Sequence, residues 1–341
     1  MNNVESTQLH SFSPEEIRDV AYAFQKSRVL LTAYELNLFS ALDDTSRSSG
    51  EVAAALGTDA RATDRLMNAL CAMGFITKEN DTFANTPASL RFLVQERPGF
   101  MAGLLHTVHL WDTWSTLSEA VRLGRAPANR EVNDRGENWL QAFIAAMHDR
   151  ASKHAPTVVA QIDLSGVSQV LDVGGGSGAY AMAFVRAGAD IRATVFDLSN
   201  VLPLTRMYIE REGLSNMVDT VAGDYLSDDL AGGYDLVFLS AIVHSNSNEQ
   251  NKLLIKKCAR ALRPGGRVIV QDFIMDEGRT SPSHGAFFAL NMLVGTDAGD
   301  TYTESEVRVW MKEAGLSEIM RKETPFGATQ IIGRKAKDQR K

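Results

Sequence analysis

Residues 171–178 read Leu-Asp-Val-Gly-Gly-Gly-Ser-Gly, and this stretch decides the fold. The apolar run Val170–Val173 predicts a buried strand, and the apolar run Ala179–Ala187 predicts a helix directly after the glycines. Glycines between the two allow a sharp turn and a close approach of a ligand to the backbone. Free amides at the start of the helix favour a polar or anionic group. We therefore expect one strand to end at a nucleotide-like ligand.

Strands and helices alternate from Val167 onward, which predicts a doubly wound α/β domain with a mainly parallel sheet. The candidate strands are Val170–Val173, Ala193–Phe196, Val218–Ala222, Leu236–Ser240 and Val268–Gln271, and candidate helices between them include Leu202–Arg211 and Glu249–Leu262. After a helix at Glu304–Ala314, the strands Ser317–Glu323 and Ala328–Gly333 are separated only by Thr324–Gly327. So short a connection predicts an antiparallel hairpin at the end of the sheet.

Residues 13 to about 100 are predicted to form helices and one small hairpin, a winged-helix pattern. Such a pattern raises the possibility of DNA binding. Residues 1–100, however, hold nine Lys/Arg and thirteen Asp/Glu, a net charge of −4, whereas contact with phosphates needs the opposite sign. Packing against a partner subunit is the better interpretation. Residues 101–160 are helical and rich in aromatic side chains, which predicts either a core stripe or the wall of an apolar pocket.

The composition argues against a nucleic-acid-binding, membrane or secreted protein. The 341 residues suggest two domains, or one with an extra lobe, and the net charge of −7 gives no electrostatic footprint for nucleic acid or an anionic membrane. The first residues lack the pattern of a signal peptide, and no apolar run approaches the length of a membrane span. Cys71 and Cys258 are far apart, which predicts buried thiols in a reducing cytoplasm and no metal site.

The glycine loop alone does not identify its ligand, because Gly174, Gly176 and Ala179 also fit the dinucleotide pattern G-x-G-x-x-A. Asp197 ends the second strand and can accept hydrogen bonds from both ribose hydroxyls. After the third strand, Asp224 can accept from an adenine amino group while the ring of Tyr225 packs on the base. The terminal hairpin disagrees with the six parallel strands of a dehydrogenase. An adenosine cofactor other than NAD is therefore favoured.

The chain resembles the class I S-adenosylmethionine-dependent small-molecule O-methyltransferases, which include the caffeate, hydroxyindole and polyketide enzymes. The motifs that carry the resemblance are Leu171–Gly178, Val195–Leu198, Ala222–Leu226, Leu239–His244 and Arg263–Val270. The resemblance implies a class I methyltransferase fold and a homodimer. It also implies a winged-helix-like dimerisation domain at 1–100, a helical linker and pocket lobe at 101–160, and a cofactor-binding catalytic domain at 161–341.

By this resemblance, S-adenosyl-L-methionine is the cofactor and the acceptor is a small molecule, with no nucleic acid, membrane or metal involved. The residues expected to bind the cofactor are Gly174, Gly176, Asp197, Leu198, Gly223, Asp224, Tyr225 and Ser240. Those expected to line the acceptor pocket are Trp111, Phe143, Met147, Met292 and Thr296, a mostly apolar set that suits an aromatic acceptor.

Methyl transfer to a phenol, whose pKa is about 10, needs a base at pH 7. His244 follows the fourth strand and is the predicted base, and Asp272 follows the fifth strand and could fix its tautomer. Two positions depart from the family pattern: Ser245 stands where relatives have an acid after the histidine, and Thr301 replaces a second acid, with Asp300 one residue away.

We expect a cytoplasmic, dimeric O-methyltransferase acting on a hydroxylated aromatic or polyketide-like molecule. Three alternatives stay open at this point. The depleted acids around the base would suit a C-methyltransferase on the same scaffold. A relative could bind the cofactor without transferring a methyl group. A winged-helix DNA-binding regulator is disfavoured by the acidic N-terminal region.

Overall fold

The computed structural model describes residues 11–128 and 136–337, and the chain separates into two compact units, Met1–Val108 and His109–Lys341. The boundary falls inside helix α7 (Leu104–Trp114) and therefore inside the expected lobe at 101–160. The further division expected at about residue 160 stays a prediction.

The first unit is built from short helices and a small sheet. Its elements are α1 (Pro14–Tyr22), α2 (Phe24–Glu35), α3 (Leu38–Leu42), β1 (Arg47–Ser48), α4 (Ser49–Leu56), α5 (Ala60–Ala72), β2 (Ile76–Glu79), β3 (Thr82–Asn85) and α6 (Pro87–Phe92). Ser48 and Asp59 cap α4 and α5, each accepting a backbone N–H in the first turn. The strands β2 and β3 pair antiparallel. The helix, turn, helix and hairpin expected in this region are all present.

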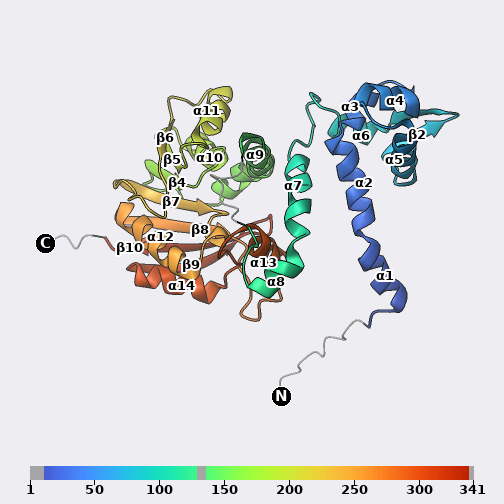
Figure 1. Ribbon diagram of the computed structural model, residues 1–341. Helices are drawn as coiled ribbons and strands as arrows, with labels where there is room; N and C mark the ends of the chain where they lie inside the picture. The colour runs from blue at the N-terminus through green and yellow to red at the C-terminus, as the bar shows by residue number, and fades with distance from the viewer. Residues whose placement is uncertain (1–10, 129–135, 338–341) are drawn as a thin grey trace, which may run out of the picture. The chain divides into compact units, whose positions relative to one another are not determined.

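The second unit is an α/β domain preceded by helices, as Figure 1 shows. Its helices are α8 (Leu117–Leu123), α9 (Glu137–Ala160), α10 (Ala179–Ala187), α11 (Leu202–Arg211), α12 (Asn248–Ala261), α13 (Ser283–Gly295) and α14 (Glu304–Glu313). Its strands are β4 (Gln169–Val173), β5 (Arg192–Asp197), β6 (Val218–Ala222), β7 (Tyr234–Ser240), β8 (Leu262–Asp272), β9 (Leu316–Glu323) and β10 (Thr329–Lys335).

The seven strands of this sheet lie in the order β6-β5-β4-β7-β8-β10-β9. The neighbours from β6 to β8 pair parallel, whereas β10 pairs antiparallel with both β8 and β9. The predicted fold class, a mainly parallel sheet closed by an antiparallel hairpin, is confirmed. The five parallel strands end at one edge of the sheet, where ligands bind in open α/β folds.

The central strand β7 shows why both faces of the sheet are covered by helices. Leu236 and Phe238 belong to an apolar cluster that includes side chains of α9, α10 and α11. Val237 and Leu239 alternate with them and belong to a second cluster with side chains of α12 and α14. Successive side chains of a strand point to opposite faces, so a continuous apolar run requires a helical layer on each side.

Substitution of Trp310 of α14 tests the packing of the second cluster. Its side chain is fully buried, and its ring lies edge-on against Tyr302 with centroids 4.7 Å apart. We expect Trp310→Ala to lower the free energy of unfolding by about 3–5 kcal/mol, because it removes a large buried side chain and leaves a cavity. The neighbouring Val309 is 45% exposed, so Val309→Ala should change stability by less than about 1 kcal/mol. Urea titration of both variants measures this, and equal losses would contradict the packing described.

Candidate active site

The glycine loop between β4 and α10 adopts a backbone that other residues rarely reach. Gly174, Gly176 and Gly178 have φ values of +66°, +56° and +75°. A Cβ atom at Gly174 would also collide with the side chain of Ile242, so this glycine is needed for space as well as conformation. The backbone N–H of Gly174 donates to the carbonyl of Phe196 at 2.7 Å and joins the loop to the end of β5.

Asp197 closes the loop from the end of β5. Its carboxylate accepts from the backbone N–H groups of Gly176 at 2.7 Å and of Leu198 at 2.8 Å. Burial raises the pKa of Asp197 to about 6, although these two hydrogen bonds lower it. Burial also raises the pKa of Asp172, behind the loop, to about 7, and the charge of Asp197 adds to that shift. The glycine loop is therefore hydrogen-bonded to a carboxylate whose ionised form is destabilised by burial.

The turn after β6 lies beside the same loop. The backbone N–H of Gly223 donates to the carbonyl of Asp197 at 3.0 Å. The carboxylate of Asp224 accepts from the backbone N–H of Leu226 at 2.8 Å, which fixes its orientation within the turn. The Tyr225 hydroxyl donates to Asn246 at 3.2 Å, and burial raises the pKa of this hydroxyl. The structure thus brings the predicted loop, ribose and adenine residues together at one edge of the sheet.

Ser240, at the end of β7, belongs to a polar cluster that the sequence did not reveal. The side-chain amide of Gln271 donates to Ser240 Oγ at 3.0 Å and to the Tyr180 hydroxyl at 2.7 Å. The side-chain amide of Gln330 of β10 in turn donates to the side-chain oxygen of Gln271 at 2.9 Å. No spacing rule links residues 180, 240, 271 and 330. The strand order makes Ser240, Gln271 and Gln330 neighbours, and Tyr180 joins them from α10.

His244, four residues after the end of β7, and Asp272, the last residue of β8, form a buried pair. His244 Nδ1 lies 2.8 Å and 3.0 Å from the two carboxylate oxygens of Asp272, and the exposed fractions of the two residues are 8% and 4%. The carboxylate also accepts from the backbone N–H groups of Phe273 at 2.8 Å and of His244 at 3.3 Å. Because a carboxylate only accepts, Nδ1 carries the proton and Nε2 is left as the basic nitrogen.

Asp300 does not reach this imidazole through its side chain. Its carboxylate is 3.3 Å from the guanidinium of Arg279 and accepts from the backbone N–H of Thr301 at 2.7 Å, while its own backbone N–H donates to the His244 carbonyl. Thr301, at the position of the second family acid, is buried. Within the part of the chain that the structure describes, Asp272 is the one carboxylate bonded to His244.

Aromatic side chains surround the pair. Phe288 of α13 lies edge-on to the His244 ring at 4.7 Å, and Phe273 lies edge-on to Phe288 at 4.8 Å. Sequence reasoning did not single out Phe273, whose only signal was its place next to Asp272. On the same helix Met292 is buried, and the Thr296 hydroxyl donates to the Met292 carbonyl at 2.7 Å.

The other predicted pocket residues lie on α7 and α9. Phe143 stacks on Trp139 with centroids 5.0 Å apart and packs in a cluster with Leu198, next to Asp197. Met147 follows one turn later on α9, and Trp111 lies on α7, both partly buried. On α9, His148 contacts Ser177 of the glycine loop at 2.9 Å. The roles of all these residues stay predictions.

The described residues contain no group of three or more His, Cys, Asp or Glu side chains that could hold a metal ion. Across residues 11–128 and 136–337, none of the helices has the length and apolar character needed to cross a membrane.

Comparisons with known proteins agree with this arrangement. A family described as the O-methyltransferase domain matches residues 114–317, and the O-methyltransferase dimerisation domain matches residues 19–95. The chain is 32% identical to a 3-hydroxy-5-methyl-1-naphthoate 3-O-methyltransferase of Streptomyces sahachiroi, over 90% of each chain. It is 30% identical to the tetracenomycin polyketide synthesis 8-O-methyl transferase TcmO of Streptomyces glaucescens, over 96% of this chain and 98% of the relative.

Two solved structures of the same fold are complexes with SAH or SAM. PigF with SAH has a TM-score of 0.87 and 26% identity, covering 95% of this chain and all of that one. Human N-acetylserotonin methyltransferase in complex with SAM has a TM-score of 0.82 and 25% identity, covering 97% of this chain and all of that one. With a family match over more than half of its length, the chain belongs to the O-methyltransferase family and is an S-adenosylmethionine-dependent O-methyltransferase.

Proposed function

We propose that the chain methylates a hydroxyl group of an aromatic or polyketide-like small molecule, with His244 as the general base. The observation that carries this proposal is the His244–Asp272 pair, buried where β7 and β8 end. Its sheet edge is the one that holds the glycine loop and Asp197.

The glycine loop fits an adenosine cofactor. A side chain at Gly174 would fill the space beside Ile242, and Asp197 presents a buried carboxylate that two ribose hydroxyls can share. We assign the cofactor contacts to eight residues: Gly174, Gly176, Asp197, Leu198, Gly223, Asp224, Tyr225 and Ser240. S-adenosylmethionine supplies a methyl carbon already activated by its sulfonium leaving group.

The protein's own task is to orient the acceptor and remove its proton. With the methyl donor bound, His244 Nε2 would take the hydroxyl proton of the acceptor. Asp272 stabilises the imidazolium that results, because both of its oxygens lie within 3.0 Å of Nδ1. Its further bonds to two backbone N–H groups hold the pair in this orientation.

The acceptor is proposed to be aromatic. Phe273 and Phe288 beside the base offer ring faces and edges to a flat apolar molecule, and Trp111, Phe143, Met147, Met292 and Thr296 are proposed to complete its pocket. The relatives from Streptomyces and the acetylserotonin enzymes are named for aromatic or polyketide acceptors, which supports the same class of acceptor.

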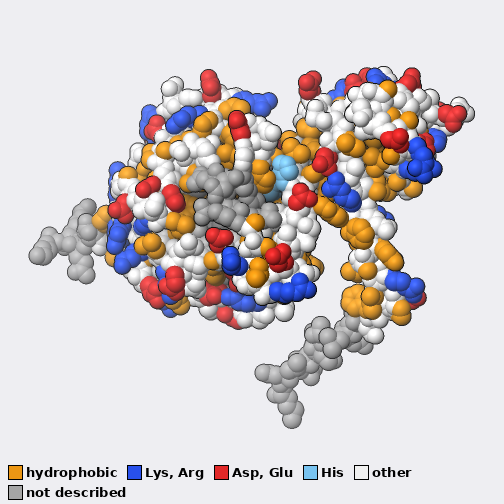
Figure 2. Space-filling view, in the orientation of Figure 1, with side chains coloured by type: hydrophobic (Ala, Val, Ile, Leu, Met, Phe, Trp, Pro, Cys, Tyr) orange, Lys and Arg blue, Asp and Glu red, His pale blue; other side chains and the backbone are white. Residues whose placement is uncertain are grey.

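A homodimer is proposed as the working state. The dimerisation-domain family matches residues 19–95. Several large apolar side chains at the start of the first unit are more than half exposed, namely Phe12, Ile17, Val20, Tyr22 and Phe24. Figure 2 shows hydrophobic side chains along this segment, an exposure that a partner subunit would relieve. The two free cysteines are consistent with the proposed cytoplasmic location.

The base is tested by His244→Gln and Asp272→Asn. We expect His244→Gln to lower kcat by about 10²–10⁴, because the acceptor then loses its proton without a positioned base. Asp272→Asn should also lower kcat, since its amide can no longer fix the tautomer of the imidazole. Affinity for S-adenosylhomocysteine, measured by calorimetry, should stay unchanged in both variants. Full activity of His244→Gln on a phenolic acceptor would contradict the assignment.

Asp197 makes cofactor binding depend on pH. The ribose hydroxyls need the ionised carboxylate, and its pKa in the free protein is raised to about 6 by burial. Binding is therefore at full strength above pH 7 and weakens as pH falls through 6, with Kd about tenfold higher at pH 5.0 than at pH 7.5. Calorimetric titration with S-adenosylhomocysteine measures the slope. Asp197→Asn should bind weakly at both pH values, and an equal slope in that variant would assign the effect to another group.

A further inference from the structure

We propose that Arg150 of α9 is a specificity-determining residue that binds an anionic substituent, a carboxylate, on the aromatic acceptor. This inference rests on the proposed function, because it assigns a second contact to the same acceptor. It adds a substrate class that the apolar pocket residues alone do not give.

Arg150 shares a helix face with two predicted pocket residues. It follows Met147 by three residues and Phe143 by seven, so the three side chains lie along one side of α9. Its guanidinium carbon lies 5.1 Å from the centre of the Phe273 ring. Phe273 directly follows Asp272 in the chain, and Arg150 itself is exposed, so its guanidinium can meet a molecule that lies over this ring.

A series of rings connects the guanidinium to the imidazole. Phe273 is in contact with Phe288, and Phe288 is in contact with His244, with centroids 4.8 Å and 4.7 Å apart. An aromatic molecule lying along these rings would present one end to His244 and the other to Arg150. A hydroxyl at the first end and a carboxylate at the second would satisfy both side chains.

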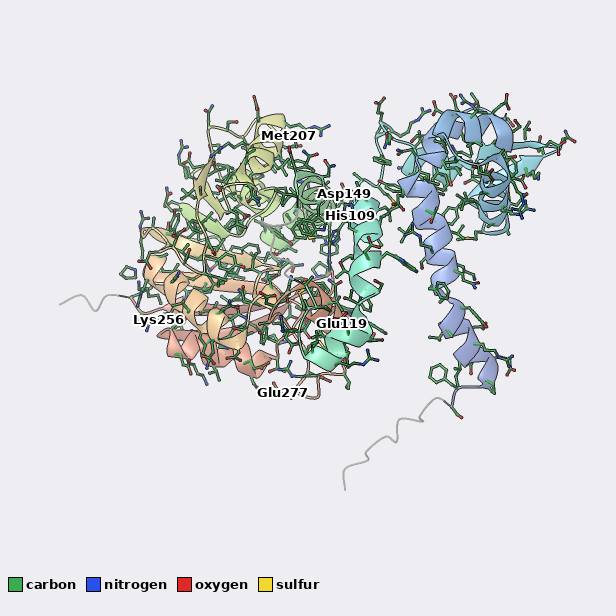
Figure 3. The ribbon with its side chains drawn as sticks, in the orientation of Figure 1. His109, Glu119, Asp149, Met207, Lys256 and Glu277 are labelled. Carbon is green, nitrogen blue, oxygen red and sulfur yellow. The ribbon has the colours of Figure 1, made fainter. Side chains whose placement is uncertain are left out.

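No carboxylate of the described residues forms an ion pair with Arg150. Other arginines of the second unit do form such pairs with a nearby acid, as Arg186, Arg279 and Arg308 do. The adjacent Asp149 is labelled on α9 in Figure 3. Its negative charge acts to raise the pKa values of His148 and Tyr208. The next turn of α9 carries the exposed ammonium group of Lys153 and the imidazole of His154. Arg150 and Lys153 both help to lower the pKa of His154, after the larger effect of burial.

Arg150 and Lys153 therefore place two cations on this part of α9, and that of Arg150 lies over the ring of Phe273. The field of Arg150 also reaches Tyr180, where it opposes the effect of burial on the hydroxyl pKa. A guanidinium lying over an aromatic ring keeps its N–H groups available at its edges, and these match a carboxylate in a bidentate arrangement. With a neutral acceptor, the N–H groups of Arg150 would bond only to water. The site therefore favours an acceptor molecule that carries a carboxylate.

The test uses 6-hydroxy-2-naphthoate and its neutral analogue 6-hydroxy-2-naphthamide, which have nearly the same shape and carry their two substituents at opposite ends of the rings. Calorimetry on the full chain saturated with S-adenosylhomocysteine compares wild type, Arg150→Gln and the control Lys153→Gln, which alters an exposed cation one turn away. We expect wild type and Lys153→Gln to bind the naphthoate about 10- to 100-fold more tightly than the amide. Arg150→Gln should lose this preference while its affinity for the amide stays the same.

Three results would overturn the inference: equal affinity of wild type for the two compounds, no binding of the naphthoate by wild type, or an unchanged preference in Arg150→Gln. Each of them leaves binding of S-adenosylhomocysteine intact. Failure of wild type to bind S-adenosylhomocysteine would instead contradict the proposed function itself, so the two failures are distinguishable.

Discussion

The hydrogen bond between His244 Nδ1 and Asp272 is the interaction on which the proposed chemistry depends. It exists because β7 and β8 are parallel neighbours in a register that pairs Ser240 with Gln271. Asp272, which follows Gln271 as the last residue of β8, is then close to His244 in the turn after β7, although 28 positions separate the two in sequence. A shift of one residue in this register would move Asp272 to the other face of the sheet.

The cofactor side of the site follows from the same sheet. Strand β4 pairs with β5 on one side and with β7 on the other, so the glycine loop lies between Asp197 and the turn that leads to His244. Ile242 in that turn occupies the space that a side chain at Gly174 would need. The loop and the base are therefore joined by direct packing, which places a methyl donor and a proton acceptor at one edge.

Sequence patterns predicted the parts of the site that short-range rules govern. Glycines in a strand-to-helix turn, a carboxylate at the end of the next strand and a histidine after the fourth strand all follow from local spacing. Strand boundaries were less accurate: β8 begins at Leu262, where the helical pattern of the preceding residues still continued. The predicted helix at Glu249–Leu262 therefore ended one residue too late.

Sequence patterns did not predict the contacts between segments that lie far apart in the chain. Asp300 was considered as a substitute acid because it lies next to Thr301, but its pairing with Arg279 depends on a loop 21 residues away. The same applies to Arg150 and Phe273, which lie 123 positions apart in sequence and meet only in the folded chain. An arginine in a helical run carries no signal of the ring that it will cover.

A crystal structure with S-adenosylhomocysteine and a hydroxylated aromatic acceptor would show directly whether His244 is the base. We expect the acceptor oxygen to lie within about 3.2 Å of His244 Nε2, on the side of the sulfur from which the methyl group departs. An acceptor oxygen bound elsewhere, with the His244–Asp272 pair intact, would contradict this role of His244.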